Sequence, residues 1–287
     1  MSRIAYVNGQ YVRHDGAAVH IEDRGYQFAD GVYEVIAVHG GRLVDEEGHL
    51  DRLAFSLSEL EIDWPVAPAA LRVILRQVIR RNGVANGIVY IQVTRGVAPR
   101  DHAFPADTDS ALVVTARRKK PLDRATAERG VSVITIPDIR WKRRDIKSIS
   151  LLPNVLGKQQ AVRAGAFEAW MYDAEDRISE GTSSNAWIVT AGGELVTRQA
   201  DHAILNGITR RAVLRIAAEQ GLTLVERPFT RDEVRQAREA FVTSTTSFVR
   251  PVIRMDGAAI GDGRAGELSL RLLDYYFDHM RAQDAAP

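Results

Sequence analysis

Residues 4–14, "IAYVNGQYVRH", predict the kind of sheet with which the chain begins. Asn8 and Gly9 stand between two runs of strand-forming residues, and an Asn-Gly pair readily takes the positive φ angles of a two-residue hairpin turn. The stretch 31–44, "GVYEVIAVHGGRLV", repeats the pattern around a Gly-Gly pair. The chain is therefore expected to open with antiparallel hairpins.

Helices and strands follow without a strict βαβ alternation. Apolar residues every three or four positions predict helices over 46–60, 69–82, 152–165, 208–221 and 267–283. A short helix is expected after Thr230, because Glu233 has the spacing of a capping box. Short apolar or β-branched runs predict strands over 87–96, 111–116, 131–136, 168–173, 186–190, 194–197 and 239–244. This mixture indicates an α/β fold of the α+β type, with mixed or antiparallel sheets.

A polar stretch divides the chain. Residues 117–130, "RRKKPLDRATAERG", carry a proline and few apolar side chains, which is typical of a linker. We expect a small N-terminal α/β domain over 1–119, an interdomain linker over 120–128, and a larger C-terminal domain over 129–287. No internal repeat was found.

Composition excludes several classes of protein. The 287 residues are 45% hydrophobic and 26% charged, as in ordinary globular proteins, and the net charge of +1 gives no field to recruit nucleic acid. There is no cysteine, which excludes disulfides and thiolate chemistry. Neither a signal peptide nor a membrane span is expected. The default expectation is a cytoplasmic protein with no membrane partner.

Two further kinds of partner are not expected. The basic clusters at 117–120 and 142–144 have acidic residues close by and no interleaved aromatic residues for stacking on bases, so nucleic acid is not predicted as a partner. His20, His39 and His49 lack metal-ligand spacing, and no metal site is predicted.

Lys147 stands out in "RRDIKSISLLPN" (143–154). Only five of the 38 basic residues are lysines. Arginine does better in most ion pairs, whereas lysine can lose its proton and act as an amine nucleophile. Covalent chemistry at Lys147 is the hypothesis, and a solvated surface charge is the plain alternative.

Other segments offer partners for such a lysine. "LNGITRRAVL" places Ile208 and Thr209 at a predicted helix start, where unpaired N–H groups favour an anion. "TSTTS" (243–247) supplies hydroxyl groups, and Arg52 supplies a positive charge. Taken singly, these features are also typical of a helix cap, a solvated loop and a solvated helix face.

Two further segments contain a candidate acid and a candidate binding site for a carboxylate. Glu180 precedes a run of hydroxyl residues in "ISEGTSSNAW", where a carboxylate could face a ring nitrogen or simply sit in a turn. Arg100 and His102 lie in the loop "VTRGVAPRDHAFP", where an arginine fork suits a substrate carboxylate. An ordinary charged loop is the alternative.

Taken together, six segments resemble the class IV pyridoxal-phosphate aminotransferases, and most closely the branch that acts on D-amino acids. They are, in order, "DRGYQFADGVYE", "VTRGVAPRDHAFP", "DIKSISLLPN", "EGTSSN", "NGITR" and "FVTSTTS". The resemblance runs from Tyr6 to about Asp256. It implies a two-domain homodimer with shared active sites and with pyridoxal 5'-phosphate between the domains.

The resemblance implies a role for each matching residue. Lys147 would be the catalytic lysine, which forms the Schiff base with the cofactor, and Glu180 would pair with the pyridine nitrogen. The remaining cofactor-binding residues would be Arg52, Ser184, Ile208, Thr209, Ser244 and Thr245. Tyr33, Arg100 and His102 would bind the substrate carboxylate, the last two reaching in from the neighbouring subunit.

The implied activity is transfer of an amino group from D-alanine or a similar D-amino acid to pyruvate or 2-oxoglutarate. The rivals within the family are a branched-chain L-amino acid transaminase, an (R)-amine transaminase and an aminodeoxychorismate lyase. From outside it, a non-catalytic module that binds phosphate ligands remains an alternative. Thr182 departs from the serine common in related sequences, and the orientation of Arg250 stays open.

Overall fold

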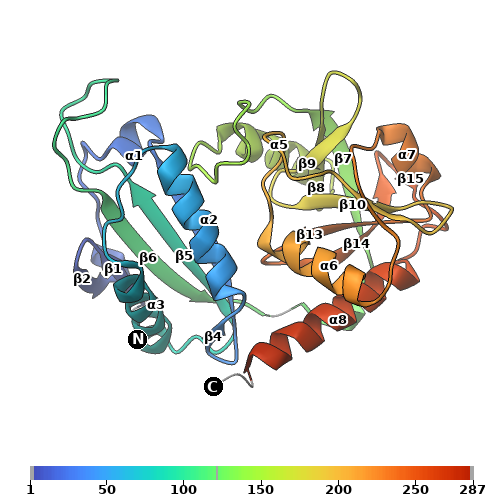
Figure 1. The fold of residues 1–287 in the computed structure, drawn as a ribbon, viewed down its shortest axis with the longest axis horizontal. Coiled ribbons are helices and arrows are strands. Elements are labelled where there is room, and N and C mark those ends of the chain that lie inside the picture. The colour runs from blue at the N-terminus through green and yellow to red at the C-terminus, as the bar shows by residue number, and fades with distance from the viewer. Residues whose placement is uncertain (1–2, 121, 285–287) are drawn as a thin grey trace. The chain divides into compact units, whose positions relative to one another are not determined.

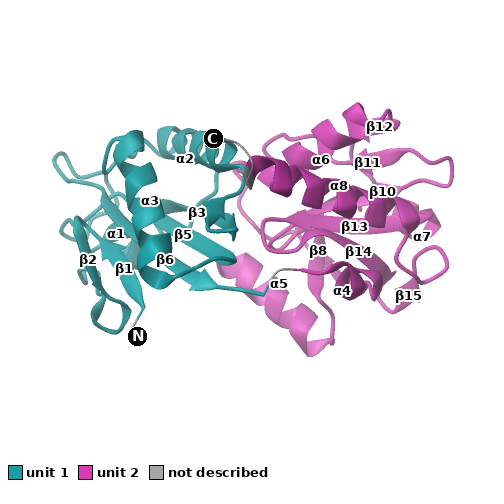
Figure 2. Cartoon of the chain, turned by 90° about the horizontal axis from the view of Figure 1, so that it is seen from below, with its two compact units in different colours: residues 1–121, 146–150 teal, residues 122–145, 151–287 magenta. Residues whose placement is uncertain are grey.

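The computed structural model describes residues 3–120 and 122–284, which form two compact units (Figure 2). Unit 1 contains the residues up to 121 together with 146–150, and unit 2 contains 122–145 and 151–287. The predicted C-terminal domain, 129–287, includes Lys147, whereas the contacts of Lys147 group it with unit 1. Within the predicted linker, Arg124–Glu128 forms helix α4, and Pro121 lies outside the described residues.

Unit 1 is built on a six-stranded antiparallel sheet. Its strands, in the spatial order β2-β1-β6-β5-β3-β4, are Gln10–Arg13, Ile4–Val7, Ala111–Arg118, Gly87–Thr94, Gly31–His39 and Arg42–Leu43. The Asn-Gly turn is confirmed, since Asn8 has a φ of 43° and Gly9 one of 92°. Both predicted hairpins, β1-β2 and β3-β4, are present.

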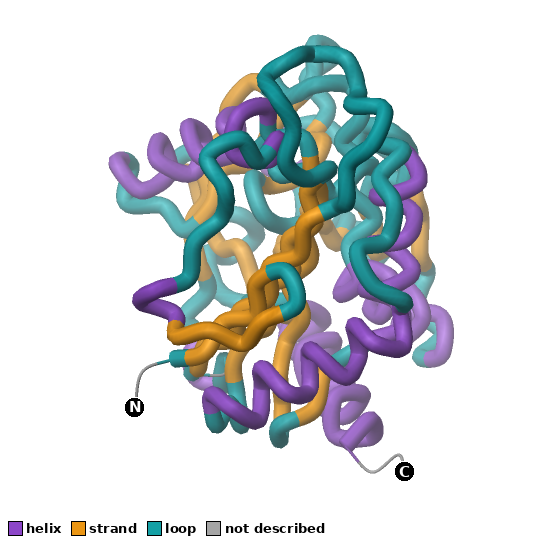
Figure 3. Tube along the Cα trace, turned by 90° about the vertical axis from the view of Figure 1, so that its left-hand side faces the viewer, coloured by secondary structure: helices purple, strands orange, loops and turns teal. Residues whose placement is uncertain are grey.

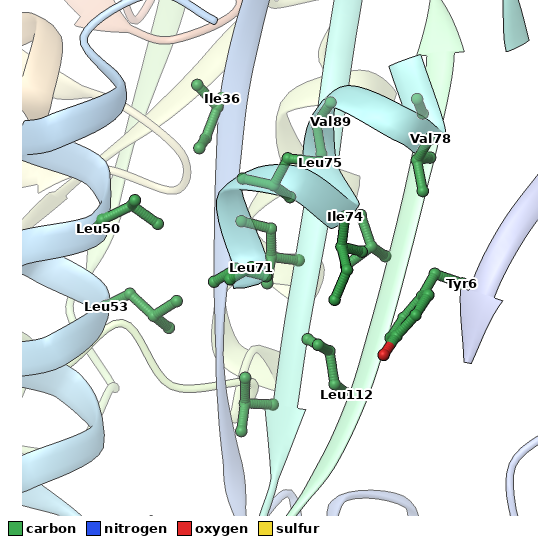
Figure 4. Close-up of a cluster of buried hydrophobic side chains, with 14 of the residues drawn as sticks. Tyr6, Ile36, Leu50, Leu53, Leu71, Ile74, Leu75, Val78, Val89 and Leu112 are labelled. Atoms are coloured by element: carbon green, nitrogen blue, oxygen red, sulfur yellow. The ribbon is translucent and has the colours of Figure 1, made fainter. Parts of the chain in front are cut away.

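Two helices of unit 1, α2 (Glu46–Glu59) and α3 (Pro68–Asn82), pack against this sheet, and a shorter helix, α1 (Arg24–Phe28), precedes β3. Figure 4 shows leucines and other aliphatic side chains of α2 and α3 meeting those of the strands. Along β3 the even-numbered residues face this core, among them Val32, Ile36 and Val38. Glu34 has the same parity, so a charged side chain enters an apolar face.

Unit 2 contains a nine-stranded mixed sheet in the order β12-β11-β10-β13-β14-β7-β8-β9, with β15 beside β14. Those strands are, in that order, Leu224–Glu226, Leu195–Thr197, Asn185–Val189, Glu239–Ser244, Phe248–Met255, Val131–Pro137, Glu168–Tyr172, Ile178–Gly181 and Ala258–Ala259. The pairs β7-β8, β7-β14 and β11-β12 are parallel and the others antiparallel. The prediction of mixed or antiparallel sheets is confirmed.

The helices of unit 2 pack on this sheet (Figure 1). In the described part of unit 2 they are the short α4, and α5 (Leu152–Arg163), α6 (Ile208–Glu219), α7 (Arg231–Gln236) and α8 (Glu267–Asp284). Figure 3 shows the helices of the chain in purple and its strands in orange. Helix α5 lies against β7 and β8, while α8 lies against β14 and is accompanied by α6. The capping box at Thr230 is confirmed, with the Glu233 N–H donating to the Thr230 hydroxyl and the Glu233 carboxylate accepting from the Thr230 N–H.

Strand β14 was not predicted, and Pro251 interrupts its apolar run. Proline cannot donate to a ladder and is normally confined to edges or irregular positions. In the structure Pro251 lies opposite Phe241 of β13, and the ladder with β7 begins only at Val252. The proline is tolerated because it stands just before the parallel pairing starts.

Candidate functional site

Lys147 lies on a short segment that extends the sheet of unit 1 beside β3. The Tyr33 N–H donates to the Lys147 carbonyl at 3.0 Å, and the Ile149 N–H donates to the Gly31 carbonyl at 3.0 Å. The Lys147 N–H donates in turn to the hydroxyl of Ser56 on α2 at 3.2 Å. The backbone of the lysine is therefore fixed from both a strand and a helix.

The side chain of Lys147 meets Tyr33. Ile146, one residue earlier, is buried in the core of unit 1, and side-chain alternation turns Lys147 the other way. Its ammonium group lies 4.2 Å from the centre of the Tyr33 ring, which itself packs 5.8 Å from the Tyr90 ring. Two of the predicted site residues, Lys147 and Tyr33, are thus brought together.

Arg52 is held in a buried ion pair. The Glu34 carboxylate accepts from Arg52 Nε at 2.7 Å and from Arg52 Nη2 at 2.9 Å, and it also accepts from His49 Nδ1 at 2.7 Å. Burial alone would raise the pKa of Glu34, but Arg52 and His49 outweigh it and hold that pKa well below its ordinary value. Burial lowers the pKa of His49, against the opposing effect of Glu34.

Arg100 and His102 lie on an exposed loop, and Arg24 holds this loop through hydrogen bonds to its backbone. The buried Arg24 guanidinium donates to the Asp101 carbonyl at 2.7 Å and to the His102 carbonyl at 3.5 Å. The Arg100 guanidinium lies 4.9 Å from the Phe28 ring centre, and the His102 ring lies 5.4 Å from it. Their aromatic contacts within the chain are with Phe28 and not with Tyr33.

Glu180 lies in unit 2, buried on β9 rather than in a turn. Its carboxylate accepts from Asn185 Nδ2 at 3.0 Å, from the Leu205 N–H at 3.2 and 3.3 Å, and from Arg140 Nη1 at 2.5 Å. Burial raises the pKa of Glu180, while Arg140 acts in the opposite direction. This carboxylate can face a positively charged ring nitrogen.

Asn185 joins the environment of Glu180 to the predicted phosphate groups. Its Nδ2 also donates to the Leu205 carbonyl at 2.9 Å, and its Oδ1 occupies the space where a side chain on Gly207 would begin. Only glycine fits there. Gly207 is the N-cap of α6 and has no side-chain cap, so Ile208 and Thr209 begin a helix whose first N–H groups suit an anion.

The second group of phosphate candidates follows β13. Thr243 pairs with Asn185 across the β10-β13 ladder, and Asn185 contacts Gly207 at the start of α6. Ser244 and Thr245 directly follow Thr243. The Ser244 and Ser247 hydroxyls are 2.5 Å apart, and the Ser247 N–H donates to Ser244 Oγ at 3.2 Å. The loop therefore concentrates hydroxyl groups at the strand end.

These groups of unit 2 fit a phosphorylated pyridine. An acid that can face the ring nitrogen and a helix start that can face the phosphate are linked through one buried asparagine. Hydroxyl donors and unpaired helix N–H groups suit a phosphate dianion. Arg52 and Lys147 belong to unit 1.

The hydroxyl run that follows Glu180 is organised by Glu168 on β8. Its buried carboxylate accepts from the hydroxyl groups of Ser183 at 2.9 Å and Ser184 at 3.1 Å, and from the hydroxyl group of Thr182. Thr182 therefore keeps the hydroxyl contact that a serine would make. Ser184, predicted to bind the cofactor, makes its hydrogen bond to Glu168.

Arg250 contacts an aromatic residue of its own unit. Its guanidinium lies 5.9 Å from the centre of the ring of Phe167, a residue that stands in the sequence between α5 and β8. Burial lowers the pKa of Arg250, and the nearby positive charge of Arg129 lowers it further.

Sequence reasoning missed Glu34, Glu168, Asp138 and Arg140. Glu34 has a usable signal, since it is a charged residue at a core-facing position of an apolar strand. The other three carry none, because the contacts that tie them to the Glu180 region, Arg140 with Glu180, Asp138 with Ser179 and Glu168 with Thr182, join segments far apart in the sequence.

Two searches of the described residues found nothing. No helix in residues 3–120 and 122–284 is long and apolar enough to cross a membrane. The same residues contain no cluster of three or more His, Asp or Glu side chains that could hold a metal ion.

Comparison with known proteins gives a family match. A family model described as amino-transferase class IV matches residues 31–255. A D-alanine aminotransferase of Listeria monocytogenes is 39% identical over 276 residues, which cover 96% of this chain and 95% of the relative. One from Staphylococcus haemolyticus is 35% identical over 280 residues, covering 98% and 99%.

Solved structures with a similar fold were also found. A branched-chain amino acid aminotransferase of T.th., solved with pyridoxamine 5'-phosphate, has a TM-score of 0.89 and 26% identity, covering 97% of this chain and 94% of that one. The Escherichia coli branched-chain amino acid aminotransferase has a TM-score of 0.87 and 23% identity, covering 98% and 95%, which shows the fold alone.

Proposed function

The chain belongs to the class IV aminotransferases, and from this premise we propose that it is a D-amino acid aminotransferase that uses pyridoxal 5'-phosphate. It would transfer the amino group of D-alanine or a similar D-amino acid to a 2-oxo acid such as pyruvate or 2-oxoglutarate. The relatives at 35–39% identity over nearly their full length support this substrate class. The pyridoxamine 5'-phosphate named for one similar structure supports the cofactor.

The observation that carries the proposal is the placement of Lys147. Its backbone is fixed by Tyr33 and Ser56, and its ammonium group lies 4.2 Å from the centre of the Tyr33 ring. When bound, pyridoxal phosphate supplies an aldehyde carbon for amine exchange and a ring that accepts electrons. Lys147 would hold the cofactor and, as a free amine, would move the proton at the substrate α-carbon.

The other roles are proposed from the family resemblance and from the contacts within unit 2. Glu180 keeps a proton on the ring nitrogen, because a buried carboxylate stabilises an adjacent positive charge. The start of α6, with Ile208 and Thr209, would bind the phosphate together with Ser244 and Thr245, and the family resemblance assigns the same role to Arg52. Ser184 acts from beside this group, through the hydroxyl run held by Glu168.

We place the substrate carboxylate against Tyr33, Arg100 and His102. The chain would act as a homodimer, in which Arg100 and His102 serve the neighbouring subunit's site. This assignment agrees with the exposure of both side chains and with their packing on Phe28 rather than on Tyr33.

A branched-chain L-amino acid aminotransferase is the second candidate, because the similar solved structures carry that name. Their identities of 23% and 26% are lower than the 35–39% of the D-alanine aminotransferases. The D-amino acid assignment is therefore the better supported of the two.

The deciding experiment follows the visible absorption of the purified protein, loaded with pyridoxal phosphate, during titration. D-Alanine is expected to bleach the cofactor band with formation of pyruvate, while L-leucine and (R)-1-phenylethylamine leave it unchanged. Bleaching by L-leucine alone would replace the D-amino acid assignment by the branched-chain one. Absence of a cofactor band after loading would overturn the enzyme assignment.

Replacing Arg100 by alanine tests the proposed carboxylate site. Loss of a charge-assisted hydrogen bond costs about 1.5–3 kcal/mol, so kcat/KM for D-alanine should fall roughly 10- to 100-fold. Cofactor affinity should stay unchanged, as measured by equilibrium dialysis. Arg117→Ala, an exposed arginine on β6, is the matched control and should behave like the parent protein. An unaltered kcat/KM in Arg100→Ala would remove Arg100 from the site.

A further inference from the structure

Glu180 is a buried carboxylate, and Arg140 and Arg144, two cations that act on it among the described residues, lie on the same segment. Its Oε1 accepts from Arg140 Nη1 at 2.5 Å, and its other hydrogen bonds come from the neutral Asn185 and Leu205 groups. The charged groups that face it are Arg140, Asp138 and, at the edge of the cluster, Arg144. Arg140 is therefore the cation closest to the proposed partner of the ring nitrogen.

The guanidinium of Arg140 joins two carboxylates. Its Nε and Nη2 donate to Asp138 at 3.0 and 2.8 Å, and this leaves Nη1 directed at Glu180. A planar fork held at two points has little freedom to turn the third nitrogen away. The direction of the Arg140–Glu180 hydrogen bond is thus set by Asp138.

Asp138 is itself held from several sides. Its side chain is fully buried and accepts from the Ser179 hydroxyl at 2.6 Å, with Arg144 Nε at 3.4 Å. Its N–H donates to the Tyr172 carbonyl at 2.9 Å. Ser179 is adjacent to Glu180 in β9, so the strand that carries the acid also holds the aspartate that orients its partner.

A buried carboxylate without a nearby cation takes up a proton more readily. A protonated Glu180 could still donate a hydrogen bond, but it would no longer stabilise positive charge on a ring nitrogen. We infer that Arg140, fixed by Asp138, is the positioning residue that keeps Glu180 ionised and directed at the cofactor. The inference rests on the proposed function for the identity of that cofactor, but not for the charge of Glu180.

The test compares Arg140→Gln, Arg140→Lys and the control Arg143→Gln in protein loaded with pyridoxal phosphate. Arg143→Gln removes the same charge three positions along the chain, from a partly exposed pair with Asp145. An opposite charge at this range shifts a carboxyl pKa by about one to three units. In Arg140→Gln the acidic limb of the kcat–pH profile should therefore move up by at least about one unit, with activity recovering at high pH.

The control variants separate a shift of the kcat–pH profile from a general loss of folded protein. Arg143→Gln should keep the parent profile, and Arg140→Lys should recover most of the shift because it keeps a positive charge. A loss in Arg140→Gln that is uniform across pH, or no loss, would contradict the inference. In a Glu180→Gln background, the further change Arg140→Gln should alter kcat little, and additive losses would also contradict it.

A readout independent of activity uses the cofactor-free full chain. Infrared difference spectra near neutral pH should show a protonated carboxyl band in Arg140→Gln, and this band should vanish in Arg140→Gln/Glu180→Gln. Absence of the band would overturn the inference even if the proposed function holds. Its presence in a protein that binds no pyridoxal phosphate would support the inference while the proposed function fails.

A second variant serves if Arg140→Gln does not fold. Asp138→Asn frees Arg140 without removing it, so the acidic limb of the kcat–pH profile should move up by a smaller amount. An unchanged profile would count against the inference.

Discussion

Lys147→Ala is expected to abolish transamination. If Lys147 both binds the cofactor covalently and moves the substrate proton, its loss removes a nucleophile and a general base together, and kcat should fall by about 10⁴-fold or more. The measurement is pyruvate formation from D-alanine with 2-oxoglutarate as acceptor. Borohydride treatment of the loaded protein should fix the cofactor to the parent chain and not to the variant.

Two controls sharpen this prediction. Lys147→Arg keeps the positive charge beside Tyr33 but cannot form an imine, so it should be as inactive as the alanine variant. Lys142→Ala removes an exposed lysine from the same segment and should leave activity unchanged. Substantial turnover by Lys147→Arg would show that only the charge matters, and the assignment would be wrong.

Glu34→Ala should cause a large loss of stability. The variant leaves the buried Arg52 guanidinium without its carboxylate, and breaking a buried ion pair in this way costs about 3–5 kcal/mol. Urea unfolding of the cofactor-free protein measures the change in the free energy of unfolding. Glu47→Ala, which removes an exposed partner of Arg72 from α2, should change it by less than about 1 kcal/mol.

The pH dependence of this stability has a definite sign. The folded-state pKa of Glu34 is lower than its ordinary value of 4.5, so the contribution of the ion pair is complete above that value. It is lost progressively as the pH falls below 4.5, because the unfolded chain then binds a proton that the folded one resists. Glu34→Ala should therefore lose less stability than the parent protein between neutral pH and pH 3. An equal acid sensitivity would show that Glu34 is not the group responsible.

The residues of the candidate site differ in how far sequence could find them. Lys147, Glu180 and the start of α6 could be singled out as candidates, because each stands in a short contiguous motif. The residue types in each motif indicate a chemical role by themselves. A turn was nonetheless the plain alternative for Glu180, since a glycine and three hydroxyl residues follow it, and the structure places it in a buried strand. Burial on both sides is a property of the neighbouring elements, which the motif does not contain.

Arg140 shows where sequence reasoning ends. It lies in a run of basic residues that resembles a solvated surface, yet it is buried between Asp138 and Glu180. The pairing of Arg140 with Glu180 joins residues 40 positions apart. Nothing in the composition of either segment specifies that contact.

The sequence by itself determined the features that depend only on residues close together in the chain. These are the Asn-Gly hairpin at the N-terminus, the capped helix after Thr230, and the family motif that contains Lys147. Turn angles and caps depend on residues a few positions apart, so a short window contains them. Only the tertiary structure decided that Arg52 is paired with Glu34 and that Lys147 packs with unit 1 on Tyr33. Such contacts depend on which elements pack together. A charged side chain that this packing buries must be paired or hydrogen-bonded, because an unpaired buried charge is costly.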